Sequence, residues 1–165
     1  ISYEDAFTGC CKPISIEREI SSSNVVRDET ETLYIPIPAG IDNNEIITVK
    51  NKGNILNKKQ SNVKIHILLN NHQVFSRQGM DLIIRRNITF RESLCGFSFN
   101  IDHLNSKTIK FSSSRGNVIL NESKKVINNL GFIRDENYGN LIIEFNIETP
   151  PKITEEQLKL IESIF

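Results

Sequence analysis

The sequence predicts an all-β fold: two successive β-sandwich domains followed by a short C-terminal amphipathic helix. Three observations lead to this prediction. Apolar and polar residues alternate in short runs through most of the 165 residues, which is the pattern of half-buried strands. Loops rich in Ser, Asn, Gly and charged residues separate these runs. Helical spacing over ten or more residues occurs only at the end of the chain, which argues against alternating α/β units.

The first half of the chain contains four alternating runs. In the first, Ile14, Ile16 and Ile20 share one face with Arg18, and polar residues occupy the other face. The runs predict strands at residues 12–20, 33–37, 45–50 and 63–67. The polar stretches at residues 21–31 and 51–62 are predicted to be loops.

Alternation restarts after residue 72. Strands are expected at residues 81–86, 97–101, 109–111 and 141–147, with a single short internal helical turn at Arg91–Cys95. The segment Asn70–Gln78 divides the strand-rich chain near its middle and is predicted to be a hinge. The expected domains are therefore residues 1–71 and 72–150, followed by a helix within residues 151–165.

The end of the chain carries helix signals. Pro150 and Pro151 stop the last strand, and Thr154 stands three residues before Gln157, the arrangement of a capping box. The apolar residues that follow recur at helical spacing; they are Leu158, Ile161, Ile164 and Phe165. A helix of about three turns is marginal in water, so this stripe is expected to pack on its own domain or on another chain.

Composition excludes several classes of partner. Acidic and basic residues both number 20, so no overall field attracts nucleic acid or an anionic membrane. No run approaches the roughly 18 apolar residues that span a bilayer. Three cysteines cannot all pair within one chain, and Cys10 and Cys11 are adjacent, so we expect reduced thiols and a cytoplasmic location.

Residues for catalysis or metal binding are not in the required patterns. The histidines are His66, His72 and His103, and none has metal-type spacing with Cys, Asp or Glu, so no metal or cofactor is expected. Cys95 precedes Gly96 and resembles a nucleophile beside a turn, but no flanking signature supports a thiol hydrolase. We therefore do not expect an enzyme.

Six stretches in collinear order carry a family resemblance. They are Phe7–Arg18, Ile35–Ile41, Val63–Ile67, His72–Leu82, Ile88–Gly96 and Gly139–Phe145. Together they resemble the C-terminal peptide-binding and dimerisation region of the DnaJ-family (heat-shock 40 kDa) co-chaperones. The strongest match is His72–Leu82, with its His, Phe, Arg, Gly and Asp-Leu at the family's spacing. The Asn- and Ile-rich composition is similar to versions from protists or large DNA viruses.

The resemblance also shows two departures. Members with a zinc-binding insertion carry Cys-x-x-Cys pairs after the first groove strand, whereas residues 21–31 contain no cysteine, which is similar to the zinc-free class. The family's preceding strand, its J domain and its Gly/Phe-rich linker have no counterpart in the 165 residues. We therefore expect a first domain whose first strand is truncated and whose groove is incomplete at one edge.

What the resemblance implies is a binding module. Ile14, Ile16 and Ile65 resemble residues of a hydrophobic groove that takes apolar side chains of non-native polypeptide clients by strand addition. Periodicity alone favours ordinary core residues, and only the resemblance favours a groove; if they are core residues, the chain is a structural dimerising β-sandwich protein without peptide binding.

Two further contacts are implied. Lys12, assisted by Arg18, resembles a position that meets the acidic C-terminal tail of a heat-shock 70 kDa (DnaK-type) chaperone, although a solvated lysine fits the pattern as well. The terminal helix falls where the family dimerises, and Leu158, Ile161 and Phe165 are the expected contacts of a homodimer. A twofold dimer presents two grooves to one client and raises avidity.

Overall fold

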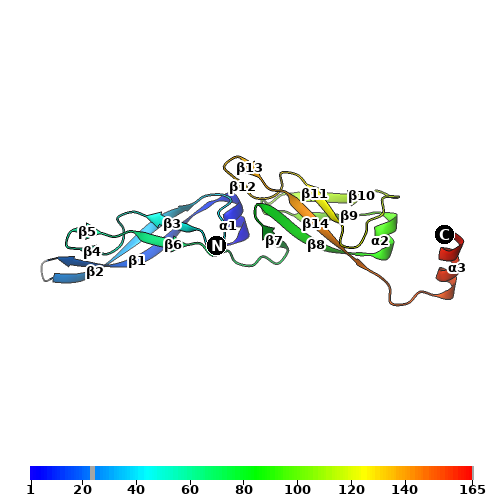
Figure 1. Cartoon of the computed structure of the whole chain (residues 1–165), viewed down its shortest axis with the longest axis horizontal. Helices are drawn as coiled ribbons and strands as arrows, with labels where there is room; N and C mark the ends of the chain where they lie inside the picture. The colour runs from blue at the N-terminus through cyan, green and yellow to red at the C-terminus, as the bar shows by residue number, and fades with distance from the viewer. Residues whose placement is uncertain (23–24, 165) are drawn as a thin grey trace.

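The computed structural model describes residues 1–22 and 25–164. The molecule is elongated, with strands β1–β6 in one half and β7–β14 in the other (Figure 1). Within the described residues, each strand pairs only with strands of its own half. This architecture confirms the predicted all-β fold with a short C-terminal helix.

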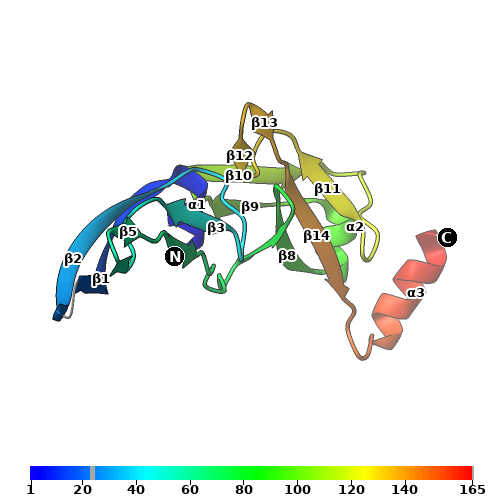
Figure 2. The same ribbon diagram turned by 60° about the vertical axis from the view of Figure 1, so that its left-hand side comes forward.

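The first half combines a four-stranded sheet, in the order β2-β1-β4-β5, with the two-stranded sheet β3-β6. The bounds are β1 Cys10–Ser22, β2 Val25–Ile37, β3 Ile46–Val49, β4 Ile55–Leu56, β5 Lys59–Gln60 and β6 Val63–His66. β1 and β2 pair antiparallel along their whole length, with Cys10 opposite Ile37 and Ser22 opposite Val25. They form a long curved ribbon that extends away from the rest of the molecule (Figure 2).

Alternation along β2 buries one face of this ribbon near its base. Leu33, Ile35 and Ile37 are 6%, 2% and 5% exposed, whereas Tyr34 between them is 72% exposed. The half-buried residues of β1, β3 and β6 pack against the same core. Burial of these side chains removes apolar surface from water, which is the main stabilising contribution of this half.

The second half is built on the sheet β11-β14-β8-β7, to which the hairpins β9-β10 and β12-β13 are added. The bounds are β7 Phe75–Gln78, β8 Asp81–Thr89, β9 Phe97–Asp102, β10 Thr108–Ser113, β11 Lys124–Ile127, β12 Ile133–Arg134, β13 Asn137–Tyr138 and β14 Leu141–Glu148. β14 runs parallel to β8 and pairs with it over eight residues, from Leu141 to Glu148. The core of the second half includes Phe145, whose ring meets those of Phe97 and Phe111 at centroid distances of 5.8 and 5.6 Å.

Three helices complete the fold: α1 Tyr3–Thr8, α2 Phe90–Cys95 and α3 Glu155–Ile164. α2 matches the predicted helical turn, and α3 begins after Thr154, which forms the predicted capping box with Gln157. α1 was not expected, so the prediction of a single short internal helix is wrong. A capping box starts α1, because Asp5 N–H donates to the Ser2 hydroxyl and Ser2 N–H donates to the Asp5 carboxylate.

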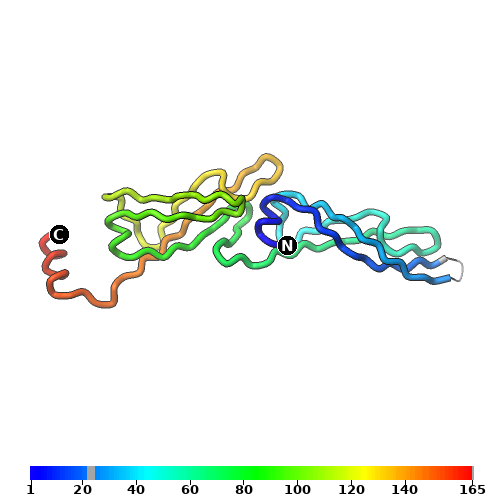
Figure 3. Tube along the Cα trace, turned by 180° about the vertical axis from the view of Figure 1, so that it is seen from behind, coloured from blue at the N-terminus to red at the C-terminus, as the bar shows by residue number. Residues whose placement is uncertain are grey.

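Other boundaries also differ from the prediction. The polar stretch at residues 21–31 is not a loop, because β1 continues to Ser22 and β2 begins at Val25; residues 23–24 lie outside the described part. Backbone pairing continues there although the ribbon has left the core, so burial gives no alternating pattern. Part of the predicted hinge at residues 70–78 is strand β7. The N-terminus lies in the middle of the molecule, beside the remaining crossover (Figure 3).

Within residues 1–22 and 25–164, every helix is too short or too polar to cross a lipid bilayer.

Candidate binding surface and the junction beside it

The outer edge of β2 is the longest strand edge in the first half. β2 has 13 residues, and β1 is the only strand among the described residues that pairs with it. An edge strand presents unpaired backbone N–H and C=O groups that can pair with another extended chain. Pro36, which has no N–H to donate, lies on this strand, in keeping with an edge position.

The three predicted groove residues are half-buried. Ile14 and Ile16 lie on one face of β1, where Ile14 is paired with Leu33 of β2. Ile65 lies in β6 of the other sheet and is paired with Ile47. All three pack against the buried core without being sealed by it, so part of each side chain reaches the surface. Both interpretations of these residues, groove and core, remain predictions.

Lys12 continues the row of Ile14 and Ile16 on the same face of β1. Its Nζ lies 2.8 Å from Oδ2 of Asp5 on α1, and the two side chains are 42% and 29% exposed. The hydrogen bond from Lys12 lowers the pKa of Asp5, and the same bond raises the pKa of Lys12. The predicted tail-contact lysine is therefore already paired with a carboxylate of its own chain.

Arg18 makes more contacts with carboxylates of its own chain than Lys12 does. Its Nε and Nη2 donate to Oε2 of Glu29 at 3.1 and 2.9 Å, and its Nη1 lies 3.0 Å from Oε2 of Glu31. Only 13% of its side chain is exposed. Glu31 also accepts a hydrogen bond from Lys52, and this bond is the main reason why the pKa of Glu31 is lowered. Arg18 thus has two carboxylate partners within the ribbon.

Beside this surface lies the region that joins the two halves, which we call the junction: α1, the turn 40–45, the segment 72–82 and the β12-β13 hairpin. Arg77 is its central cation, with a side chain only 8% exposed. Its Nε donates to Gly79 O at 2.7 Å within the second half. Its two Nη groups reach the first half, where they donate to the Ile41 and Gly40 carbonyls at 2.6 and 2.9 Å and to Asp42.

The ring of Phe132 completes the setting of Arg77, because the guanidinium carbon lies 3.9 Å from the ring centroid. Phe132 is fully buried. Tyr3 and Phe7 of α1 meet the same ring at centroid distances of 6.1 and 5.6 Å. Desolvation lowers the pKa of Arg77, because burial disfavours the charged guanidinium.

A second arginine fastens the β12-β13 hairpin to the first half. The two Nη groups of Arg134 donate to both carboxylate oxygens of Glu45 at 2.7 and 2.8 Å, a bidentate pair. These bonds lower the pKa of Glu45 and raise that of Arg134. Close to them, a Cβ at Gly40 would lie 2.4 Å from Ile133 O, and Gly40 has a φ of +76°. Only glycine fits this approach without strain.

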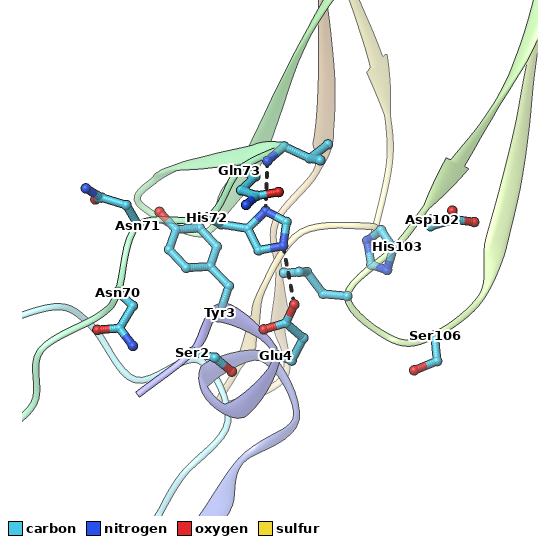
Figure 4. Close-up of a pocket in the computed structure, with 12 residues that line it drawn as sticks. Ser2, Tyr3, Glu4, Asn70, Asn71, His72, Gln73, Asp102, His103 and Ser106 are labelled. Carbon is cyan, nitrogen blue, oxygen red and sulfur yellow. Dashed lines mark hydrogen bonds and ion pairs between the residues drawn. The ribbon is translucent and has the colours of Figure 1, made fainter.

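A cavity of about 680 Å³ opens at the junction, and Figure 4 shows the side chains that line it. His72 stands between the two halves. Its Nδ1 accepts hydrogen bonds from the backbone N–H groups of Val74 and Phe75 at 3.1 and 3.0 Å, so the proton of the neutral ring resides on Nε2. That nitrogen points to Oε1 of Glu4 on α1, 3.3 Å away. His72 therefore shapes the crossover between the halves.

These contacts explain the pattern His72–Leu82. His72 orders the crossover, Phe75 and Leu82 are buried in the core, and Arg77 binds the turn 40–45. Asp81 accepts a hydrogen bond from Asn140 N–H at 2.7 Å, which ties β8 to the start of β14. The resemblance identified the segment His72–Leu82 from sequence. That this segment joins the two halves depends on contacts with residues far away in the chain, which the sequence does not show.

Two of the three predicted dimer residues, Leu158 and Ile161, lie on α3, which stands apart from the second half (Figure 1). No described residue of α3 is buried; Leu158 and Ile161 are 38% and 40% exposed. Phe165, the third predicted contact, lies outside the described residues. An apolar cavity of about 620 Å³ separates α3 from α2, with Phe90, Leu94, Ile153, Leu160 and Ile161 among its lining residues.

The residues considered for catalysis do not come together. Cys95 ends α2 and is exposed, and the lining residues of the two cavities that it borders include no histidine. His66 lies in β6 of the other half, and His103 is buried, where it bonds to Leu130 O. In the described part of the chain, no three His, Cys, Asp or Glu side chains are grouped in a way that could hold a metal ion.

Fold and surface together define an all-β protein with two sheet-built halves in line and a long edge strand beside a half-buried apolar row. Comparison with known proteins identifies the family to which this fold belongs. Residues 1–150 match the DnaJ C terminal domain family, and the chain belongs to that family. This confirms the resemblance drawn from the six stretches.

Several curated relatives are similar along most of this chain. It is 36% identical over 138 residues to the chaperone protein DnaJ of Borreliella burgdorferi, covering 81% of this chain and 37% of that protein. It is 35% identical over 132 residues to the DnaJ of Caldicellulosiruptor bescii, covering 77% and 33%. It is 29% identical over 143 residues to the chaperone protein dnaJ 2 of Arabidopsis thaliana, covering 84% and 34%. The chain thus spans about a third of the length of these relatives.

Proposed function

We propose that this chain is the client-binding part of a co-chaperone that assists protein folding. Its clients are extended segments of non-native polypeptides, which add as a further strand to the outer edge of β2. The relatives are named chaperones, and this supports the proposal. The observation that carries it is the 13-residue edge of β2 beside the half-buried row of Ile14 and Ile16.

In this proposal the backbone and the side chains of the binding surface have different roles. Backbone pairing along β2 provides affinity for any extended sequence, while apolar contacts at Ile14, Ile16 and Ile65 select clients with exposed hydrophobic side chains. Such segments are buried in native proteins and accessible in non-native ones. A surface of this kind therefore binds unfolded chains in preference to folded ones, without recognising a particular sequence.

The proposed partners are the acidic C-terminal tail of a heat-shock 70 kDa chaperone and a second copy of this chain. Lys12 is the proposed contact for a tail carboxylate, with Arg18 assisting through its position in the same row. Leu158, Ile161 and Phe165 are the proposed dimer contacts. Because a ten-residue helix is marginal alone, the absence of burial on the described part of α3 favours a partner surface.

We assign residues 1–71 to a first, peptide-binding domain and 72–150 to a second domain, following the two groups of sheets. The chain acts by binding and carries out no reaction of its own. Only residues 23 and 24 separate β1 from β2, which favours the zinc-free class. Free thiols at Cys10, Cys11 and Cys95 favour the cytoplasm.

A matched pair of variants tests client binding. Ile14→Asp places a carboxylate in the apolar row, and Ser15→Asp places the same group one residue away on the opposite, exposed face of β1. A fluorescein-labelled peptide with alternating leucines is titrated against wild type and both variants. We expect saturable binding by wild type and Ser15→Asp and at least a tenfold loss in Ile14→Asp. Circular dichroism checks that both variants remain folded, and Ile14→Ala replaces Ile14→Asp if that variant does not fold.

A second candidate is a structural dimerising β-sandwich protein, favoured by the packing of Ile14, Ile16 and Ile65 against the core. This candidate predicts no saturable peptide binding by the wild-type chain. It also predicts that Ile14→Asp lowers stability without any binding phenotype, so the same titration separates the two functions.

A further inference from the structure

The basic residues of the proposed ligand surface are already occupied by carboxylates of the same chain. On one face of β1, the row of alternate residues runs Lys12, Ile14, Ile16, Arg18, with a cation at each end of two apolar residues. Asp5 pairs with the first cation. Glu29 and Glu31 pair with the second.

The two pairs differ in how readily an incoming acidic ligand can replace them. Arg18 has two carboxylate partners, three close N···O contacts and a side chain only 13% exposed. Lys12 has one partner, one close contact and a side chain 42% exposed. Exposed single ion pairs contribute little stability and exchange with solvent and ions, whereas a multiply bonded arginine keeps its geometry.

We infer that Asp5 is a built-in competitor for acidic ligands, which occupies Lys12 in the free chain and lowers the affinity of this surface for a ligand carboxylate. The inference rests on the proposed binding of an acidic tail and specifies how that site is regulated. An arriving carboxylate either displaces Asp5 or joins it at Lys12, whose ammonium has three N–H donors. In both cases the negative charge of Asp5 opposes binding.

Position in the fold supports an exchange at Lys12. A ligand strand on the outer edge of β2 lies two strand spacings, about 9.6 Å, from β1. Lys12 is opposite Ile35 of β2, on the half-buried face that a ligand's apolar side chains would share. A flexible lysine and a ligand glutamate can span that gap together. Arg18, with its fork fixed on Glu29 and Glu31, is not free to reorient in this way.

Asp5 also connects this contact to the junction. It belongs to the capping box of α1, and the neighbouring Glu4 faces His72. Release of Lys12 from Asp5 leaves the Asp5 carboxylate free to accept the Ser2 N–H alone. α1 therefore keeps its N-terminal cap when the ligand is bound.

The test uses two single-charge neutralisations. Asp5→Asn removes the competitor and keeps an oxygen that accepts the Ser2 N–H, so the cap of α1 is retained. Glu29→Gln removes the same charge at Arg18, which keeps Glu31, and controls for net charge. The probe is a short fluorescein-labelled peptide with alternating leucines and two glutamates at its C-terminal end. The neutral probe has glutamines in their place and an amidated C-terminus.

For the glutamate probe we expect Asp5→Asn to bind about two- to five-fold more tightly than wild type at low salt. Glu29→Gln should bind as wild type does, and the gain should vanish in Asp5→Asn with Lys12→Gln. The neutral probe should not distinguish Asp5→Asn from wild type. Higher salt should reduce the gain, since the Lys12 and Asp5 side chains are both partly exposed to solvent.

Two results overturn the inference in different ways. If wild type binds the glutamate probe and Asp5→Asn binds no better, or no better than Glu29→Gln does, Asp5 is not a competitor, and the proposed function stands. If neither wild type nor Asp5→Asn binds the glutamate probe saturably, the proposed acidic-tail contact fails and the inference fails with it.

Discussion

Arg77 offers the sharpest test of how the two halves are joined. Its guanidinium donates four hydrogen bonds, three of which cross to the turn 40–45, and it stacks on the buried ring of Phe132. Arg77→Ala removes all of these contacts. Arg77→Lys keeps the positive charge but replaces the fork with a single ammonium that cannot reach every acceptor.

The structure sets the size of the effect. Hydrogen bonds to charged groups contribute about 1.5–3 kcal/mol each, but such values do not add within one network. Removing one partner from a buried charged network costs about 3–5 kcal/mol, because the remaining groups lose their partners. Gly40 O and Ile41 O are left without a donor in Arg77→Ala, whereas Asp42 is 59% exposed and regains water. We therefore expect a loss of about 3–5 kcal/mol for Ala and about half of that for Lys.

Urea denaturation followed by circular dichroism measures both losses. The total stability of a domain is about 5–15 kcal/mol, so Arg77→Lys stays measurable even if Arg77→Ala is largely unfolded. A loss below about 1 kcal/mol for Arg77→Ala would contradict the reasoning, since that is the range of an exposed ion pair. A negligible loss for Arg77→Lys would show that the fork geometry is unimportant.

Three further predictions concern the junction and α3. Phe132→Ala should lower the free energy of unfolding by about 3–5 kcal/mol in urea denaturation, as for other buried aromatic residues, and a loss below about 1 kcal/mol would mean that the site is not tightly packed. The folded-state pKa of Glu45 is lowered by Arg134, so the stability gained from this pair is present above the carboxyl's ordinary pKa of 4.5 and is lost as pH falls through the lower folded-state value. Urea midpoints of Arg134→Gln between about pH 6 and pH 3 should therefore fall less steeply than those of wild type, and parallel curves would remove this assignment. Leu158→Asp with Ile161→Asp should sediment as a monomer where wild type sediments as a dimer, and a monomer in both cases would end the dimer proposal.

The sequence predicts those elements whose burial alternates. Leu33, Ile35 and Ile37 are nearly inaccessible while the residues between them are exposed, and this contrast is what the alternating pattern encodes. The terminal helix was also predictable, because the Thr154 capping signal acts within a few residues of chain. Local chemistry and period-two burial thus carry most of the fold class.

Elements without a burial pattern escaped the prediction. Residues 25–30 of β2 are all exposed and pair with β1 beyond the core, so their side chains give no alternating signal. α1 has six residues, too few for a helical period, and the only signal for it was the pair of Ser2 and Asp5 three residues apart. A capping-box rule that also accepts Asp at the third helical position would have found it.

The candidate site depends still more on tertiary contacts. Lys12 could be selected by resemblance, but its pairing with Asp5 arises because α1 folds back beside β1. The edge position of β2 depends on which strands pair across the whole first half. Arg77 meets the turn 40–45 from more than 30 residues away, and no local pattern indicates that contact.

Amide hydrogen exchange along β2 tests the central claim, that an extended client adds to this strand. The chain is compared with and without a saturating concentration of the alternating-leucine peptide. We predict slower exchange within Val25–Ile37, greatest near Leu33, with little change in the strands of the second half. Saturable binding with unchanged exchange in β2, or with protection confined to another strand, would contradict the account.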